Sequence, residues 1–240
     1  MSFEDQRVVL LGGTSGIGLA TAEAAAAAGA SVVVASSSAA RVDAALERLP
    51  ATAEGRVVDL LDEAAVGGLF VEIGRFDHLV YTAGEALALG LVAETSVATA
   101  RAALELRVWG AYAAVKHAAP HLREGGSIVL SSGSAGSRPQ PGWSVGALIC
   151  GGVEGLTRAL AVELAPVRVN AVRPGVVRTD LWRGMAEEDR DGMYAAIAAD
   201  LPVGRVGEAA DVAASCLYLM DNRYTTGTVL TVDGGTLIAV

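Results

Sequence analysis

The strongest structural signal in the chain lies between residues 10 and 18, which read Leu10-Leu11-Gly12-Gly13-Thr14-Ser15-Gly16-Ile17-Gly18. This stretch overlaps the end of a short apolar run, Arg7–Leu11, and opens a helix-length segment, Gly16–Ala28. Glycines at such a junction let the backbone turn tightly and approach a pyrophosphate, whose charge is stabilised by the free N–H groups at the helix start. The stretch predicts a nucleotide-binding loop, and a plain glycine-rich turn stays open as the alternative.

From this loop outward, short apolar runs alternate with helix-length segments along the chain. Most of the runs are continuously apolar, which is typical of parallel strands covered on both faces. The expected strands are Arg7–Leu11, Ser31–Ala35, Arg56–Asp59, His78–Tyr81, Ser127–Ser131, Arg168–Val172 and Val229–Val232. The expected helices are Gly16–Ala28, Ala39–Leu49, Glu63–Ile73, Thr95–Leu122, Gly146–Leu164 and Glu208–Met220.

The alternation predicts an α/β fold with a single Rossmann-like doubly wound parallel sheet. We expect about seven strands with helices on both faces, because right-handed crossovers place the helices on both sides of the sheet. No charge run, repeat or low-complexity linker divides the chain. A single domain over residues 1–240 is therefore expected.

Composition excludes several classes of function. The 240 residues include 27 acidic and 18 basic side chains, a net charge of −9, which repels phosphate backbones and anionic lipids, so we expect neither nucleic acid nor a membrane as a partner. Cys150 and Cys216 are too far apart in sequence for a cysteine-rich zinc site or a disulfide scaffold, and the three histidines show no ligand spacing, so no metal is expected. The acidic N-terminus lacks the basic segment followed by an apolar segment that is typical of a secretory signal, and a cytoplasmic location is expected.

The loop has the spacing Gly-x-x-x-Gly-x-Gly, and with it the chain resembles the short-chain dehydrogenase/reductase family, in the branch of about this chain length. The resemblance extends over nearly the whole sequence. Its further matches are Asp59, Ala83-Gly84, the run from Gly126 to Ser132, the run from Arg168 to Thr179, Thr226-Gly227 and the run from Val232 to Gly235.

The resemblance implies a dinucleotide cofactor. The residues expected to bind it are Gly12, Thr14, Ser15, Gly16, Ile17, Gly18, Ser36, Ser37, Arg41, Asp59, Leu60, Ala83, Gly84, Pro174, Gly175, Val177 and Thr179. After the second strand the chain has Ser36-Ser37-Ser38 and then Arg41, where a carboxylate would bind a free ribose 2′-hydroxyl. Hydroxyls and an arginine favour a 2′-phosphate, so NADP(H) is expected over NAD(H), unless Arg41 is only a solvated helix residue.

The resemblance implies a mechanism that uses an Asn, a Ser, a Tyr and a Lys. In this mechanism the Tyr is the general acid/base, and the Lys lowers the pKa of the Tyr. Ser132 matches the serine, and Ser134 is a second candidate. The tyrosine and lysine positions hold Gly146 and Cys150, and the asparagine position holds Arg107. A carbonyl that receives hydride needs a proton donor. Because the Tyr and Lys positions hold other residues, we expect the ordinary mechanism of the family to be absent or weakened. Cys150 is either a nucleophile or, as is more usual, a buried small side chain.

The chain contains one Tyr-x-x-x-Lys, formed by Tyr112 and Lys116, which lies in the expected helix Thr95–Leu122, before the serine strand. An aromatic residue at that place in the family packs the helix, so this pair is interpreted as a decoy. Lys116 is the only lysine of the chain, so no other Tyr–Lys pair exists. Tyr81 and Arg107 are the side chains expected to reach toward Gly146.

Three functions stay open. The first is an atypical NADP(H)-linked oxidoreductase acting on a carbonyl or alcohol of a small apolar molecule, with Ser132, water or substrate supplying the proton. The second is a non-redox enzyme (enolisation, elimination or cyclisation) in which Arg107 and Ser132 polarise a substrate oxygen, unless Arg107 belongs to a structural ion pair. The third is a catalytically silent partner subunit.

By resemblance, residues 180–202 form a substrate lid. Small residues such as Gly151 and Gly152 favour a homodimer or homotetramer, and a hetero-oligomer also stays open.

Overall fold

The computed structural model describes residues 1–84, 87 and 89–239, and its centre is a seven-stranded sheet in the order β3-β2-β1-β4-β5-β6-β9. The strands are β1 (Arg7–Leu11), β2 (Ser31–Ser36), β3 (Glu54–Val57), β4 (Phe76–Tyr81), β5 (Leu122–Ser131), β6 (Arg168–Pro174) and β9 (Val229–Val232). All six neighbouring pairs are parallel. The predicted doubly wound α/β fold is confirmed. The strand order changes direction between β1 and β4, which is where such sheets bind ligands.

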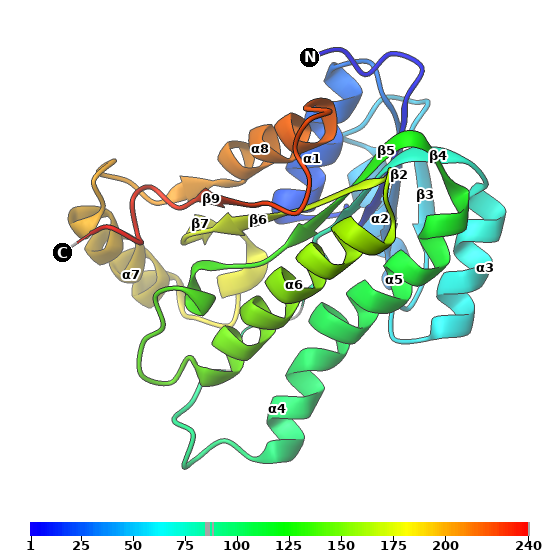
Figure 1. Ribbon diagram of the computed structural model, residues 1–240. Coiled ribbons are helices and arrows are strands. Elements are labelled where there is room, and N and C mark those ends of the chain that lie inside the picture. Colours follow the sequence, from blue (N-terminus) through cyan, green and yellow to red (C-terminus); the bar gives the residue numbers. More distant parts are fainter. Residues whose placement is uncertain (85–86, 88, 240) are drawn as a thin grey trace.

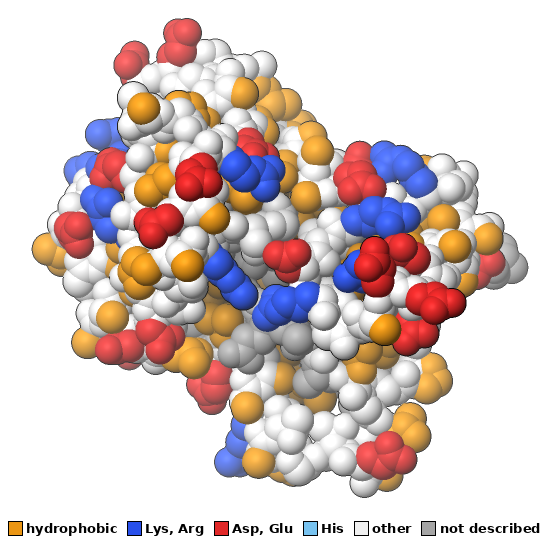
Figure 2. All heavy atoms as spheres, turned by 180° about the vertical axis from the view of Figure 1, so that it is seen from behind, with side chains coloured by type: hydrophobic (Ala, Val, Ile, Leu, Met, Phe, Trp, Pro, Cys, Tyr) orange, Lys and Arg blue, Asp and Glu red, His pale blue; other side chains and the backbone are white. Residues whose placement is uncertain are grey.

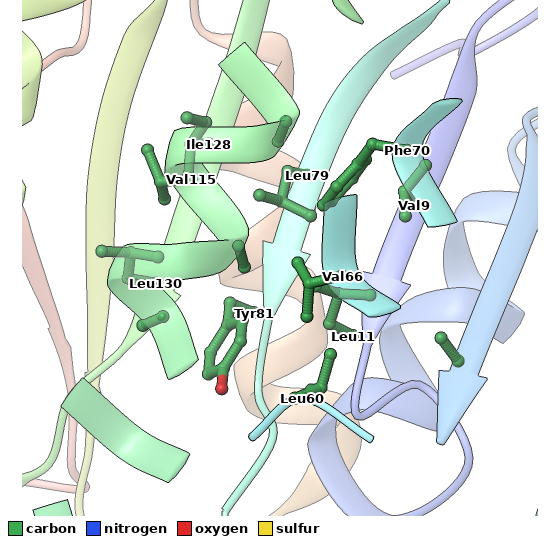
Figure 3. Packing of buried hydrophobic residues seen from close by; sticks show 14 of the residues in the cluster. Val9, Leu11, Leu60, Val66, Phe70, Leu79, Tyr81, Val115, Ile128 and Leu130 are labelled. Atoms are coloured by element: carbon green, nitrogen blue, oxygen red, sulfur yellow. The ribbon is translucent and has the colours of Figure 1, made fainter. Parts of the chain in front are cut away.

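Helices cover both faces of this sheet (Figure 1). One layer contains α1 (Gly16–Ala27), α2 (Ala39–Leu46) and α8 (Ala209–Asp221), and the other contains α3 (Glu63–Ile73), α5 (Ala111–Ala118) and α6 (Ser144–Glu163). Alternate side chains of β1 serve the two cores, because successive strand residues point to opposite faces. Val9 and Leu11 join the core with Phe70 and Val115, which Figure 3 shows, whereas Leu10 joins the other core.

The single helix expected over Thr95–Leu122 changes helix type along its length. The structure has α4 (Val97–Leu104), a π-helical turn (Glu105–Gly110), α5 and a 3₁₀ turn (Ala119–His121) without a gap, and β5 begins at Leu122. The π-helical turn lies where the Tyr81 hydroxyl, from β4, donates to the Leu106 carbonyl oxygen at 2.6 Å. A single π-turn inside a helix often marks a functional site.

Helix α6 is long and apolar enough to cross a bilayer by length and composition alone. Core helices of soluble proteins meet the same criteria. Val145, Ile149, Val153 and Leu160 on α6 are buried, which accounts for much of its apolar character. On the face seen in Figure 2, acidic and basic side chains are interspersed, as expected of a water-exposed surface.

Three short elements complete the part that surrounds the carboxyl ends of the strands. They are the two-stranded sheet of β7 (Val177–Arg178) and β8 (Gly207–Glu208), the 3₁₀ turn Asp180–Trp182, and α7 (Glu187–Asp200). Trp182, Tyr194 and Val206 form a small buried cluster of their own there. The expected lid, residues 180–202, thus contains a helix that the sequence pattern did not predict.

Candidate functional site

One cavity of about 380 Å³ lies at the carboxyl ends of the central strands. It is lined by every residue that was expected to bind the dinucleotide: Gly12, Thr14, Ser15, Gly16, Ile17, Gly18, Ser36, Ser37, Arg41, Asp59, Leu60, Ala83, Gly84, Pro174, Gly175, Val177 and Thr179. It is also lined by Ser132, Arg107, Gly146 and Cys150, the four positions at which catalytic residues were expected, and by Ser134. The fold therefore brings all of the candidate positions into one place.

The loop after β1 needs glycine for steric reasons. Gly12 has φ +86°, and a Cβ on it would lie 2.5 Å from the backbone nitrogen of Ala83. A Cβ on Gly18 would collide with the carbonyl oxygen of Gly12. Ser15, the N-cap of α1, makes no side-chain capping hydrogen bond within the described residues. The loop and the N–H groups at the start of α1 thus form a narrow cradle that suits a pyrophosphate.

At the end of β2 the three serines have different roles. The Ser38 hydroxyl oxygen accepts from the backbone N–H of Arg41 at 3.4 Å and caps α2, whereas Ser36 and Ser37 line the cavity. Arg41 also lines it, and no salt bridge joins Arg41 to a carboxylate within the described part of the chain. A positive charge and two hydroxyls therefore border this end of the cavity.

Ser132 belongs to a buried polar network that sequence reasoning missed. Its hydroxyl donates to Oε1 of Glu154 at 2.9 Å, and Arg173 binds the same carboxylate twice, Nε to Oε1 at 2.8 Å and Nη2 to Oε2 at 2.6 Å. Burial alone would raise the pKa of Glu154, but the hydrogen bonds from Arg173 and Ser132 outweigh it and lower that pKa. The signal for Glu154 was its helical spacing: Gly146, Cys150 and Glu154 lie four residues apart on α6.

Gly146 and Cys150 offer space and a protonated thiol. A Cβ on Gly146 would meet, within 4 Å and among the described residues, only the Cβ of Ala135 at 3.6 Å, so a larger side chain has room to start there. Cys150 is 8% exposed, and burial raises the pKa of its thiol. A nucleophile must be a thiolate, so the geometry favours the interpretation of Cys150 as a buried small side chain.

Arg107 comes to the cavity from the π-helical turn. Its guanidinium lies against the backbone of Gly84, where a Cβ would be 2.5 Å from the Arg107 Cζ. Tyr81 was expected to reach toward Gly146, but its side chain does not line the cavity. It is 3% exposed and its hydroxyl donates to Leu106, deep among the core residues of Figure 3. Burial raises the pKa of Tyr81, so the phenol is a structural donor and Arg107 is the cationic group here.

The Tyr112–Lys116 pair lies away from the cavity. Tyr112 is half-exposed, and Lys116 Nζ binds Glu63 Oε1 at 2.6 Å on the surface between α3 and α5. Neither side chain lines the cavity. This position matches the interpretation of the pair as a decoy.

An apolar wall lines the remainder of the cavity and is defined here as Leu87, Leu89, Leu106, Trp143, Ile149, Val176, Leu181 and Trp182. Its residues come from separate parts of the chain. Leu181 and Trp182 belong to the expected lid. Within the described residues, no three His, Cys, Asp or Glu side chains gather so as to hold a metal ion.

Known proteins resemble the chain over its whole length. A family model described as enoyl-(acyl carrier protein) reductase matches residues 12–236. The short-chain dehydrogenase/reductase fsr5 of Gibberella fujikuroi is 34% identical, with 97% of this chain and 95% of that protein covered. A small-chain dehydrogenase solved in complex with NADPH is 40% identical, with a TM-score of 0.87, over 98% of this chain and 100% of the other. MalC reductase/Diels-Alderase from Malbranchea aurantiaca is 30% identical, with a TM-score of 0.91, over 98% of both chains.

Proposed function

The chain belongs to the short-chain dehydrogenase/reductase family, and we propose that it is a reductase that uses NADP(H) on a carbonyl or alcohol of a small apolar molecule. The observation that carries the proposal is the continuous cavity at the carboxyl ends of the strands, which joins the glycine loop and Arg41 to the apolar wall and Arg107. A cofactor site and a substrate chamber are then continuous, as hydride transfer requires.

The residues fit a dinucleotide. Gly12 and Gly18 leave the loop a cradle that a Cβ would fill, and Ser36, Ser37 and Arg41 border the end expected to hold the adenosine ribose. Their charge and hydroxyls favour a 2′-phosphate, and the 40% identical relative was solved with NADPH. We therefore prefer NADP(H) over NAD(H).

The proposed mechanism depends on Arg107. When bound, NADPH supplies the hydride, and the substrate oxygen then develops negative charge. The family's Tyr and Lys positions hold Gly146 and Cys150 here, so another group must meet that charge. The Arg107 guanidinium has a permanent positive charge, five N–H donors and a place on the cavity lining. Arginine does not give up a proton, so water protonates the product oxygen.

The test is NADPH oxidation with a panel of apolar ketones and enones. Arg107→Gln keeps hydrogen-bonding capacity and removes the charge, so we expect kcat to fall by about 10²–10³-fold with little change in NADPH affinity. Arg101→Gln, on the exposed surface of α4, is the matched control and should keep full activity. Turnover that survives in Arg107→Gln would contradict the assignment.

A ring-forming, non-redox reaction is the second candidate. The space beside Gly146 and the apolar wall would enclose a folded apolar substrate, and one 30% identical relative is named a reductase/Diels-Alderase. Product analysis without added NADPH separates the two functions. Under this alternative, Gly146→Tyr fills the space and abolishes product formation without changing NADPH affinity.

A further inference from the structure

The direction of the Ser132 hydrogen bond restricts what Ser132 offers to a ligand. Its hydroxyl contacts Glu154 Oε1 at 2.9 Å and, at the long distance of 3.5 Å, the carbonyl oxygen of Cys150. Both of these partners are acceptors, and an ionised carboxylate has no proton to give. The Cys150 side chain also hydrogen-bonds Ser132, and its protonated thiol can occupy one lone pair of the hydroxyl oxygen. Ser132 has one hydroxyl hydrogen, so that hydrogen is directed at Glu154 and only oxygen lone pairs are left for the cavity.

The carboxylate is held in its ionised form. Glu154 is 8% exposed, and its two oxygens accept three charge-assisted or hydroxyl hydrogen bonds, two from Arg173 and one from Ser132. Such contacts favour the ionised form strongly, and the pKa of Glu154 is lowered despite the opposing effect of burial. Ser132 therefore keeps its acceptor character at neutral pH.

We propose that Glu154 is a positioning residue that makes Ser132 a hydrogen-bond acceptor toward the substrate. The group that Ser132 binds is then an N–H or O–H of the substrate, while Arg107, which only donates, takes a carbonyl oxygen. This assigns a substrate class: an apolar molecule with a hydrogen-bond donor close to a carbonyl, such as a lactam, an amide or an enol of a dicarbonyl. The inference rests on the proposed placement of substrate beside Ser132.

Removing the carboxylate removes the group that directs the Ser132 hydrogen. Glu154→Gln does not do so, because Arg173 donates to both oxygens and an amide oxygen at the Oε1 position would still accept from Ser132 and from Arg173 Nε. Glu154→Leu leaves no acceptor at that place, so the Ser132 hydroxyl hydrogen is released toward the cavity and Ser132 becomes a donor for the ligand.

The experiment measures binding of a benzo-fused lactam, dihydroquinolinone, and of its N-methyl derivative by calorimetry, with and without saturating NADPH. Wild type should bind the N–H lactam roughly three- to tenfold more tightly, which is the effect of one hydrogen bond. Glu154→Leu should lose or invert that preference. Ser132→Ala, which leaves the Glu154–Arg173 pair intact, should bind both lactams equally. Glu63→Gln, on an exposed carboxylate that accepts from Lys116, is the control and should keep the wild-type preference.

Equal affinity of the wild type for the two lactams, including no binding of either, overturns the inference. So does an unchanged preference in folded Ser132→Ala. If Glu154→Leu does not fold, as checked by thermal unfolding, the Ser132→Ala comparison still decides. Because binding is measured apart from turnover, a preference for the N–H lactam without any NADPH oxidation would support this inference and contradict the proposed reductase activity.

Discussion

At the scale of single residues, the candidate site depends on the contact between Arg107 and Gly84. A guanidinium that stabilises an oxyanion must be held in place before the reaction. The backbone of Gly84 provides a flat surface for it only because that residue has no side chain.

The Gly84→Ala variant tests this contact. The added methyl group would lie 2.5 Å from Arg107 Cζ and must displace the guanidinium. We expect kcat, measured with saturating NADPH, to fall at least tenfold. Gly68→Ala is the matched control, since no described atom lies within 4 Å of the place that its methyl group would take on α3. It should leave activity unchanged and stabilise the fold by about 0.5–1 kcal/mol. Full activity in Gly84→Ala would exclude a role for this contact.

At the scale of elements, neighbouring strands share a buried histidine. His78 on β4 lies 2.8 Å, through Nδ1, from the Ser127 hydroxyl on β5, and 2.6 Å, through Nε2, from Gln6 Oε1 before β1. Burial lowers the pKa of His78 from its ordinary value to about 4. The imidazole is thus neutral in the folded protein at neutral pH.

Acidification should therefore destabilise the protein through His78. In the unfolded chain, His78 binds a proton below its ordinary pKa, near 6.5. In the folded chain, it binds that proton only when the pH falls to about 4. Stability is lost across that window as the pH falls, by roughly 3 kcal/mol. Denaturant unfolding at several pH values measures it. The loss between pH 7 and 4 should be clearly smaller in His78→Asn, and an identical pH dependence in the two proteins would contradict the expectation.

Some helices and strands have the bounds that the sequence predicts, and others do not. Strands β1 and β9 and helix α3 have the predicted bounds, because each is a continuous apolar or amphipathic run that depends on local pattern. The π-helical turn at residues 105–110 was not predicted, because it involves the Tyr81 hydroxyl from a different strand. Glu154 was missed, although it shares a helix face with Gly146 and Cys150, because its partner Arg173 is 19 residues away, on β6. Contacts over such separations leave no periodic signal that identifies the partner.

At the scale of the whole molecule, one apolar side of α6 is not covered. Leu148 and Val162 are 58% and 81% exposed, and nothing among the described residues lies within 4 Å of a Cβ placed on Gly151 or Gly155. Trp109, in the adjacent π-helical turn, is 57% exposed. Glycines on an exposed helix are otherwise unfavourable. We propose that a second copy of the chain packs on this surface, as the family resemblance suggests.

Sedimentation velocity tests the assembly. Wild type should sediment as a dimer or tetramer, and Val162→Glu should shift it toward monomer, because an unpaired charge in an apolar interface is costly. Val71→Glu places the same change at a 72% exposed valine of α3 and should leave the assembly intact. A monomeric wild type at micromolar concentration would contradict the proposal.

The central claim is that this cavity transfers hydride without the family's Tyr and Lys. Its most direct test follows the label from NADPH that carries deuterium at the transferable position. Wild-type protein is incubated with the carbonyl panel, and the products are analysed by mass spectrometry. We predict that the alcohol product gains one deuterium and that Arg107→Gln forms it about 10²–10³-fold more slowly. Product that forms without deuterium, or equally fast in Arg107→Gln, would contradict the account.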